Sequence, residues 1–158
     1  MNSSKIVLFL DFDGVCHRDR ARPDEYFKNK GLIEDVIRSF SGLQVVVSST
    51  WKNGYSIDEL ARHFSEDIRN RFIDVTPSLK NSSDSYVPGH ISEYPRQWEI
   101  ETWMKRNRDG DDIGIAIDDR RDWFRENCPW LICTDGLVGC TSEDAKRLTK
   151  LIVKRSER

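Results

Sequence analysis

A continuous apolar run, Ile6–Leu10, leads directly into the acidic segment Asp11–Gly14. An uninterrupted apolar run of this length is typical of a strand that is buried on both faces, as in the middle of a parallel sheet. Similar apolar runs occur at residues 43–47, 72–75, 113–117 and 130–134. The sequence therefore predicts a central sheet of five parallel strands.

Segments with helical spacing separate these runs. Residues 31–40 place Leu32, Ile33, Val36 and Ile37 on one face of a helix. A capping-box pattern at Ser56 and Glu59 predicts the start of a second helix, with an apolar stripe that continues to Ile68. Further helices are expected near residue 96 and from residue 141. Strands that alternate with helices predict an α/β fold, a three-layer Rossmann-like domain with helices on both faces of the sheet.

The segment at residues 76–94 is rich in Ser, Pro and Asn and has no clear period. We expect a long loop there, and long loops in compact domains are often functional. A length of 158 residues fits one domain, so residues 1–158 are expected to form a single unit.

Composition limits the classes of function. Charged residues make up 33% of the chain and the net charge is −2, which indicates a solvated surface and argues against a strongly basic nucleic-acid-binding domain. No apolar run approaches the roughly 18 residues that a membrane span needs, and the N-terminus does not resemble a signal peptide. The four cysteines match no common zinc pattern. Free thiols predict a reducing compartment, hence the cytoplasm.

Polar residues follow three of the predicted strands at the point where each ends. These are Asp11 with Asp13, Ser48 with Ser49, and Asp118 with Asp119. In open α/β sheets, ligands bind beyond the carboxyl ends of the strands. Sheet geometry is therefore expected to bring the three groups together at one edge, where they would form a binding site.

Carboxylates gathered at one edge would repel one another without a cation. Hard oxygen ligands suit Mg²⁺, which is the cofactor that we expect. A carboxylate such as Asp11, placed beside a bound phosphate, can attack phosphorus. A second carboxylate two residues on, Asp13, can donate a proton to the leaving oxygen and later take one from water. Ser48 can donate a hydrogen bond to a phosphate oxygen. Taken alone, an Asp-x-Asp pair would also suit a solvated turn.

Three motifs carry a resemblance to a known superfamily. Asp11–Val15 after a hydrophobic strand resembles the first motif of the haloacid dehalogenase-like (HAD-like) phosphatases, Val45–Ser48 resembles the second, and Ile115–Asp119 resembles the fourth. The resemblance implies that Asp11 is the nucleophile and a metal ligand, and that Asp13 is the acid/base and gives its carbonyl oxygen to the metal. The expected site residues are Asp11 and Asp13 for catalysis, Ser48, Ser49 and Arg96 for phosphate, and Asp11, Asp13, Asp118 and Asp119 for metal.

The cation of the third motif varies in position within this superfamily. Arg96 is the preferred candidate because it shares the buried stripe of its helix with Ile100 and Trp103, and a charge there is best explained by an anionic partner. Lys80 is the second candidate and Lys52 the third.

Finer patterns narrow the expected function. Ser48–Trp51 and Arg96–Trp103 resemble the small, capless domains of this superfamily in bacterial RNA-repair proteins. The resemblance implies a Mg²⁺-dependent phosphomonoester hydrolase with an aspartyl-phosphate intermediate, acting on a phosphorylated substrate such as the 3′- or 5′-phosphate end of a polynucleotide. The alternatives are a phosphate- or nucleic-acid-end-binding module with little turnover, a small-metabolite phosphatase, and a phosphoacceptor domain of the response-regulator type. Oligomeric state and substrate identity stay open.

Overall fold

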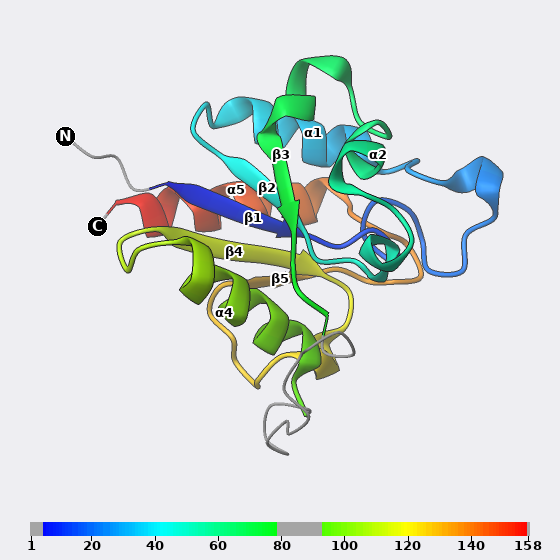
Figure 1. Ribbon diagram of the computed structural model, residues 1–158. Coiled ribbons are helices and arrows are strands. Elements are labelled where there is room, and N and C mark those ends of the chain that lie inside the picture. The colour runs from blue at the N-terminus through cyan, green and yellow to red at the C-terminus, as the bar shows by residue number, and fades with distance from the viewer. Residues whose placement is uncertain (1–4, 79–92, 158) are drawn as a thin grey trace.

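A computed structural model describes residues 5–78 and 93–157, and its centre is a parallel sheet with the strand order β3-β2-β1-β4-β5 (Figure 1). The five strands are β1 (Ile6–Leu10), β2 (Gln44–Val47), β3 (Phe72–Val75), β4 (Ile113–Asp118) and β5 (Leu131–Cys133). All four pairings between neighbours are parallel. The predicted five-stranded parallel sheet is confirmed.

Helices cover both faces of this sheet. They are α1 (Lys30–Ser39), α2 (Ile57–Ala61), α4 (Pro95–Asn107) and α5 (Ser142–Ser156). Helices α1 and α5 lie on one face and α4 on the other, which gives the three layers of a Rossmann-like α/β fold (Figure 1). Short 3₁₀ helices occur at residues 23–25, 50–53, 66–71 and 121–123. No helix in the described ranges is both long and apolar enough to cross a membrane.

The first strand shows why its apolar run is continuous. Leu8 and Leu10 are buried on the side of α1 and α5, whereas Val7 and Phe9 are buried on the side of α4. On that second face, the ring of Phe9 packs edge-on against Trp103, with 5.6 Å between the ring centroids. Since successive side chains point to opposite faces, a central strand covered on both sides needs apolar residues at every position.

The second predicted helix is shorter than its apolar stripe suggested. Helix α2 ends at Ala61, and Ile68 lies in the separate 3₁₀ helix at residues 66–71. The carboxylate of Glu34 holds the start of this 3₁₀ helix, because it accepts hydrogen bonds from the backbone N–H and the hydroxyl of Ser65, at 2.7 and 3.0 Å. Ile68 stays buried, so the stripe identified the core side chains correctly but not the element that carries them.

The register of the sheet aligns the strand ends. Leu10 pairs with Val47 on one side and with Ile117 on the other. The next residues, Asp11, Ser48 and Asp118, therefore lie at the same level at the ends of three adjacent strands. Strand β1 also lies where the chain order reverses, between β2 and β4, and such a switch point is where ligands bind in open α/β sheets.

Candidate active site

Three carboxylates meet beyond the ends of β1 and β4. Oxygen atoms of Asp11, Asp118 and Asp119 lie within 4.8 Å of one another, and the first two residues are buried. Burial, followed by the charge of Asp11, raises the pKa of Asp118 well above its usual range. Burial and a hydrogen bond with Asp11 raise the pKa of Asp119 to about 7. The three carboxylates repel one another, and their hard oxygen donors fit a divalent cation such as Mg²⁺.

Two glycines leave room for Asp119. A Cβ atom added at Gly14, which has a φ of +79°, would come within 2.1 Å of Asp119 Oδ2. A Cβ atom added at Gly136 would come within 2.6 Å of the same oxygen. A side chain at either position would displace this carboxylate, so the loops after β1 and β5 set its place in the cluster.

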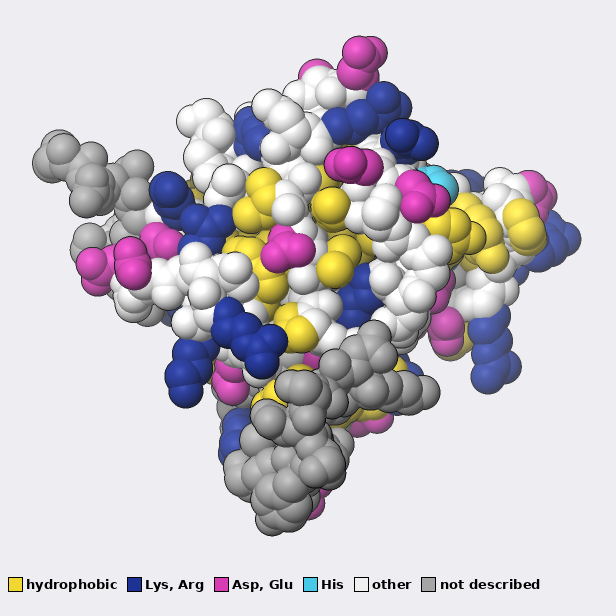
Figure 2. Space-filling model, in the orientation of Figure 1, with side chains coloured by type: hydrophobic (Ala, Val, Ile, Leu, Met, Phe, Trp, Pro, Cys, Tyr) yellow, Lys and Arg dark blue, Asp and Glu magenta, His cyan; other side chains and the backbone are white. Residues whose placement is uncertain are grey.

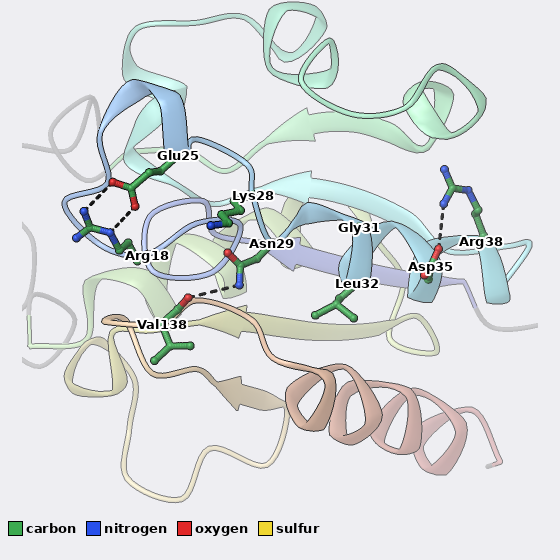
Figure 3. A pocket seen from close by; sticks show the side chains of 9 residues that line it. All are labelled: Arg18, Glu25, Lys28, Asn29, Gly31, Leu32, Asp35, Arg38 and Val138. Atoms are coloured by element: carbon green, nitrogen blue, oxygen red, sulfur yellow. Dashed lines mark hydrogen bonds and ion pairs between the residues drawn. The ribbon is translucent and has the colours of Figure 1, made fainter.

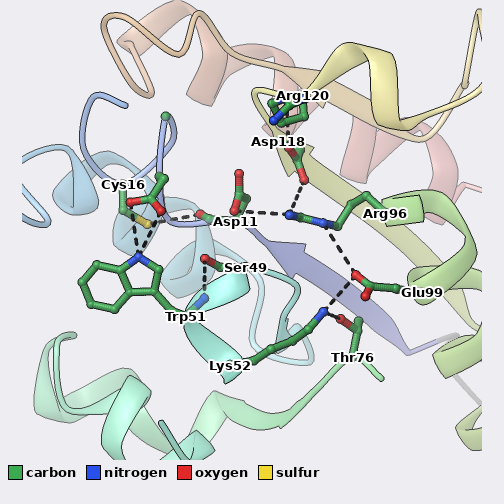
Figure 4. Close-up of polar contacts among 12 residues, drawn as sticks. Asp11, Cys16, Ser49, Trp51, Lys52, Thr76, Arg96, Glu99, Asp118 and Arg120 are labelled. Carbon is green, nitrogen blue, oxygen red and sulfur yellow. Dashed lines mark hydrogen bonds and ion pairs between the residues drawn. The ribbon is translucent and has the colours of Figure 1, made fainter. Parts of the chain in front are cut away.

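Arg96 lies between two of these carboxylates (Figure 4). Its Nη1 atom is 2.8 Å from Asp118 Oδ2 and 3.3 Å from Asp11 Oδ1. The residue belongs to the first turn of α4 and is buried. The structure thus brings the preferred third-motif candidate into the acidic cluster, while Lys80 lies outside the described residues.

Lys52, the third candidate, is connected to the acidic cluster through Glu99 and Arg96. Its ammonium group donates hydrogen bonds to Glu99 Oε1 at 2.9 Å and to Thr76 Oγ1 at 2.8 Å. Burial lowers the pKa of Lys52. Glu99 Oε1 is also 3.8 Å from Arg96 Nε, so a chain of charges runs from Lys52 through Glu99 to Arg96. Sequence reasoning did not predict a role for Glu99, although its spacing of three residues from Arg96 on a helix was the available signal.

The two serines after β2 differ in their surroundings. Ser48 Oγ is buried, and among the described residues it has no hydrogen-bond partner. A buried hydroxyl without a partner costs free energy, which indicates that a ligand completes it. Ser49 Oγ, in contrast, accepts a hydrogen bond from the backbone N–H of Trp51 at 3.3 Å and caps the 3₁₀ helix at residues 50–53. The hydroxyl of Ser48 is therefore the stronger candidate for contact with phosphate.

The side chain of Asp13 is held apart from the acidic cluster. His17 Nε2 lies 2.8 Å from Asp13 Oδ1, and the indole N–H of Trp51 donates to both carboxylate oxygens at 3.2 Å. The hydrogen bond from His17 is the main cause that lowers the pKa of Asp13. Contact of the Asp13 carbonyl oxygen with a metal stays a prediction.

The tautomer of His17 follows from its surroundings. The backbone N–H of Phe27 donates to His17 Nδ1 at 3.1 Å, so this nitrogen carries no proton. The neutral ring must then carry its proton on Nε2, which donates to Asp13. His17 is fully buried, and it connects the segment after the first motif to Asp13. Sequence reasoning assigned it no role, because the contact depends on the path of a loop.

Cys16 is adjacent to this site but is not suited to act as a nucleophile. Its Sγ lies 3.6 Å from the carbonyl oxygen of Asp11 (Figure 4). Burial raises the pKa of the Cys16 thiol well above its ordinary value. The thiolate, not the thiol, is the reactive form. Asp11 is thus the better candidate nucleophile.

A cavity of about 630 Å³ lies between α1 and the preceding segment (Figure 3). None of the four aspartates of the expected site lines it. Two ion pairs occupy several of its charged groups, Arg18 with Glu25 at 2.6 Å and Arg38 with Asp35 at 3.1 Å. This cavity is therefore not part of the candidate active site.

Comparison with known proteins identifies the family of the chain. Neither the curated proteins nor the solved structures gave a significant match. A family described as the HAD domain in Swiss Army Knife RNA repair proteins matches residues 7–145. The match extends from β1 into α5 and includes all three strand-end motifs. The chain therefore belongs to the family of HAD domains that occurs in Swiss Army Knife RNA repair proteins.

Proposed function

We propose that this chain is a Mg²⁺-dependent phosphomonoester hydrolase in which Asp11 is the nucleophile. The observation that carries the proposal is the unpartnered, buried hydroxyl of Ser48, which follows the strand next to Asp11 at the same level. Arg96 lies 3.3 Å from Asp11 and supplies a fixed positive charge. A donor and a cation that flank a carboxylate suit a phosphate group held for attack.

The chemistry needs two steps. A carboxylate oxygen of Asp11 attacks phosphorus, the bond to the leaving oxygen breaks, and that oxygen takes a proton from Asp13. Water then attacks the aspartyl-phosphate while Asp13 takes its proton, which releases inorganic phosphate and restores Asp11. A divalent cation held by Asp11, Asp118 and Asp119 would neutralise charge on the transferring group.

The hydrogen bonds to Asp13 fit its second role directly. A lowered pKa favours the carboxylate form, which is the form that accepts a proton from water. Donation in the first step requires the protonated form, and a phosphate dianion bound nearby would raise the pKa of Asp13 toward it. A module that only binds phosphate would not need a second carboxylate held in this way, so the contacts from His17 and Trp51 favour an enzyme.

The proposed substrate is the terminal phosphate of a polynucleotide. The family description names RNA repair proteins, which supports a nucleic-acid end. In the described ranges, the chain forms the central sheet and its covering helices without an inserted cap domain, which supports a bulky substrate (Figure 1). The four free thiols support a reducing compartment such as the cytoplasm.

A substrate screen tests this proposal. We expect phosphate release in the presence of Mg²⁺ from oligonucleotides with 3′- or 5′-phosphates, and slower release from glycerol phosphate. Each phosphate that a protein neutralises on a single strand adds about 0.7 to the slope of log K against log salt concentration. Lys52 and Arg96 are both buried in the site, where salt screens their charges less. The advantage of the oligonucleotide should therefore shrink only modestly as salt rises. Failure to hydrolyse any monoester with Mg²⁺ would contradict the proposal.

A further inference from the structure

An aromatic cavity of about 450 Å³ opens beside Asp13, and the 3₁₀ helix at residues 50–53 forms part of its wall. Its lining residues are Asp13, Tyr26, Thr50, Trp51, Gly54 and Tyr55. Tyr26 is 42% exposed and Tyr55 is 50% exposed, so both side chains are accessible to a ligand in the cavity. Hydrophobic side chains gather on the surface beyond the strand ends, beside the projecting segment that follows β1 (Figure 2).

The three rings form a cavity with a fixed floor. Trp51 is the floor, because its indole N–H is bound to Asp13 and its ring contacts both tyrosines. Its centroid lies 5.3 Å from that of Tyr26, with the planes nearly perpendicular, and 6.0 Å from that of Tyr55. The two tyrosines, which are both partly exposed, form the rims.

The charges of the side chains that line this cavity determine which type of ligand can bind there. Neither Lys nor Arg is among its lining residues, and its one carboxylate is that of Asp13. The lining therefore offers no cation to hold a phosphate inside the cavity. An uncharged aromatic ring would instead stack on the exposed tyrosine faces, with Thr50 available for a hydrogen bond.

The position of Asp13 decides which aromatic ring this is. Asp13 borders the cavity, and in the proposed function it gives a proton to the leaving oxygen. The leaving group must then lie on the Asp13 side of the phosphate, where the cavity is. We propose that the cavity binds the base of the terminal nucleotide whose sugar carries the phosphate, on a single-stranded nucleic acid. This inference rests on the proposed function through the role of Asp13.

The test measures binding without turnover. The Asp11→Asn protein is titrated, with Mg²⁺, into labelled single-stranded oligonucleotides that carry a 3′- or 5′-phosphate. Each oligonucleotide is compared with one whose terminal nucleotide lacks its base. Since a base that stacks on an aromatic side chain contributes to the affinity of a single strand, we expect the abasic end to bind at least about tenfold more weakly.

Variants of one rim residue assign this difference to the cavity. Tyr55→Ala should remove most of the difference between the two ends, whereas Tyr55→Phe, which keeps the ring, should preserve it. Val153→Ala removes a similarly exposed apolar side chain from α5 and should have no effect. Melting temperatures establish that each variant is folded.

The outcomes are distinct for the two proposals. Equal binding of normal and abasic ends, or a difference that survives Tyr55→Ala, would overturn the cavity assignment. Tighter binding of a phosphotyrosyl peptide than of any oligonucleotide would overturn it in favour of a protein substrate. Discrimination of the base by a wild-type protein that hydrolyses nothing would support the cavity and reject the hydrolase.

Discussion

Arg96 Nη1 lies 2.8 Å from the carboxylate of Asp118 and also contacts Asp11 at 3.3 Å, so one guanidinium joins the ends of β1 and β4. All three residues are buried. Solvent cannot compensate these charges, and Arg96 therefore supports the fold as well as the expected phosphate site.

Replacement of Arg96 by Met should lower stability. Removal of one partner from a buried charge pair leaves the other charge uncompensated, which typically costs about 3–5 kcal/mol. We expect a lower melting temperature for Arg96→Met in chelator, with partial recovery in Mg²⁺. Arg106→Met, an exposed position on the same helix, is the matched control. Equal melting temperatures for the two variants would show that the charge cluster is compensated in another way.

Gly136→Ala should weaken metal binding while the fold is kept. The new Cβ atom would come within 2.6 Å of Asp119 Oδ2 and push that carboxylate aside. Changes around metal ligands commonly reduce metal affinity by about 10- to 100-fold, so the Mg²⁺ concentration for half-maximal activity should rise at least about tenfold. Gly42→Ala is the control, because its Cβ atom would meet nothing within 4 Å. An unchanged Mg²⁺ requirement would remove Asp119 from the metal site.

Asp13→Asn should slow hydrolysis of ordinary monoesters severely. The amide cannot donate a proton to the leaving oxygen as a carboxylic acid does. A substrate with a good leaving group, such as an activated aryl phosphate, needs little protonation and should lose less rate. The measurement is the ratio of the two kcat/KM values in wild type and variant. Equal loss for both substrates would contradict the general-acid role of Asp13.

Removal of divalent metal should abolish activity. Asp11, Asp118 and Asp119 supply hard oxygen donors that suit Mg²⁺, and a cation would offset the repulsion among the three carboxylates. Chelator should stop turnover and Mg²⁺ should restore it. Ca²⁺ should restore it poorly, because its bonds are longer and its coordination number is higher. Full activity in excess chelator would exclude the proposed mechanism.

The strands and their ends were predictable because burial on both faces of a sheet produces continuous apolar segments in the sequence. A strand such as Ile6–Leu10, covered on both faces, must be apolar throughout, and parallel order brings the following residues to one edge. The position of Arg96 could be predicted for a similar reason, since a charge within an apolar stripe needs a buried partner. Its partners, Asp118 and Asp11, are those that the strand-end motifs supplied.

Contacts that depend on loop paths were not predictable. The bond from Phe27 to His17 requires a backbone φ of 62° at Phe27, which no periodic pattern reveals. Lys52 and Glu99 are 47 positions apart in the chain, and each is only one of several charges in its segment. The contact of Ser65 with Glu34 likewise joins two segments 31 positions apart in the chain. Such contacts follow from three-dimensional packing rather than from local spacing.

The central claim is that Asp11 attacks phosphorus, and Asp11→Asn tests it most directly. Asparagine has nearly the same shape but cannot attack as a carboxylate does, so the protein should remain folded. The measurement is the rate of phosphate release from a phosphorylated oligonucleotide in Mg²⁺, with a melting curve for each protein. The account predicts no release above background by folded Asp11→Asn protein. Release at the wild-type rate would contradict it.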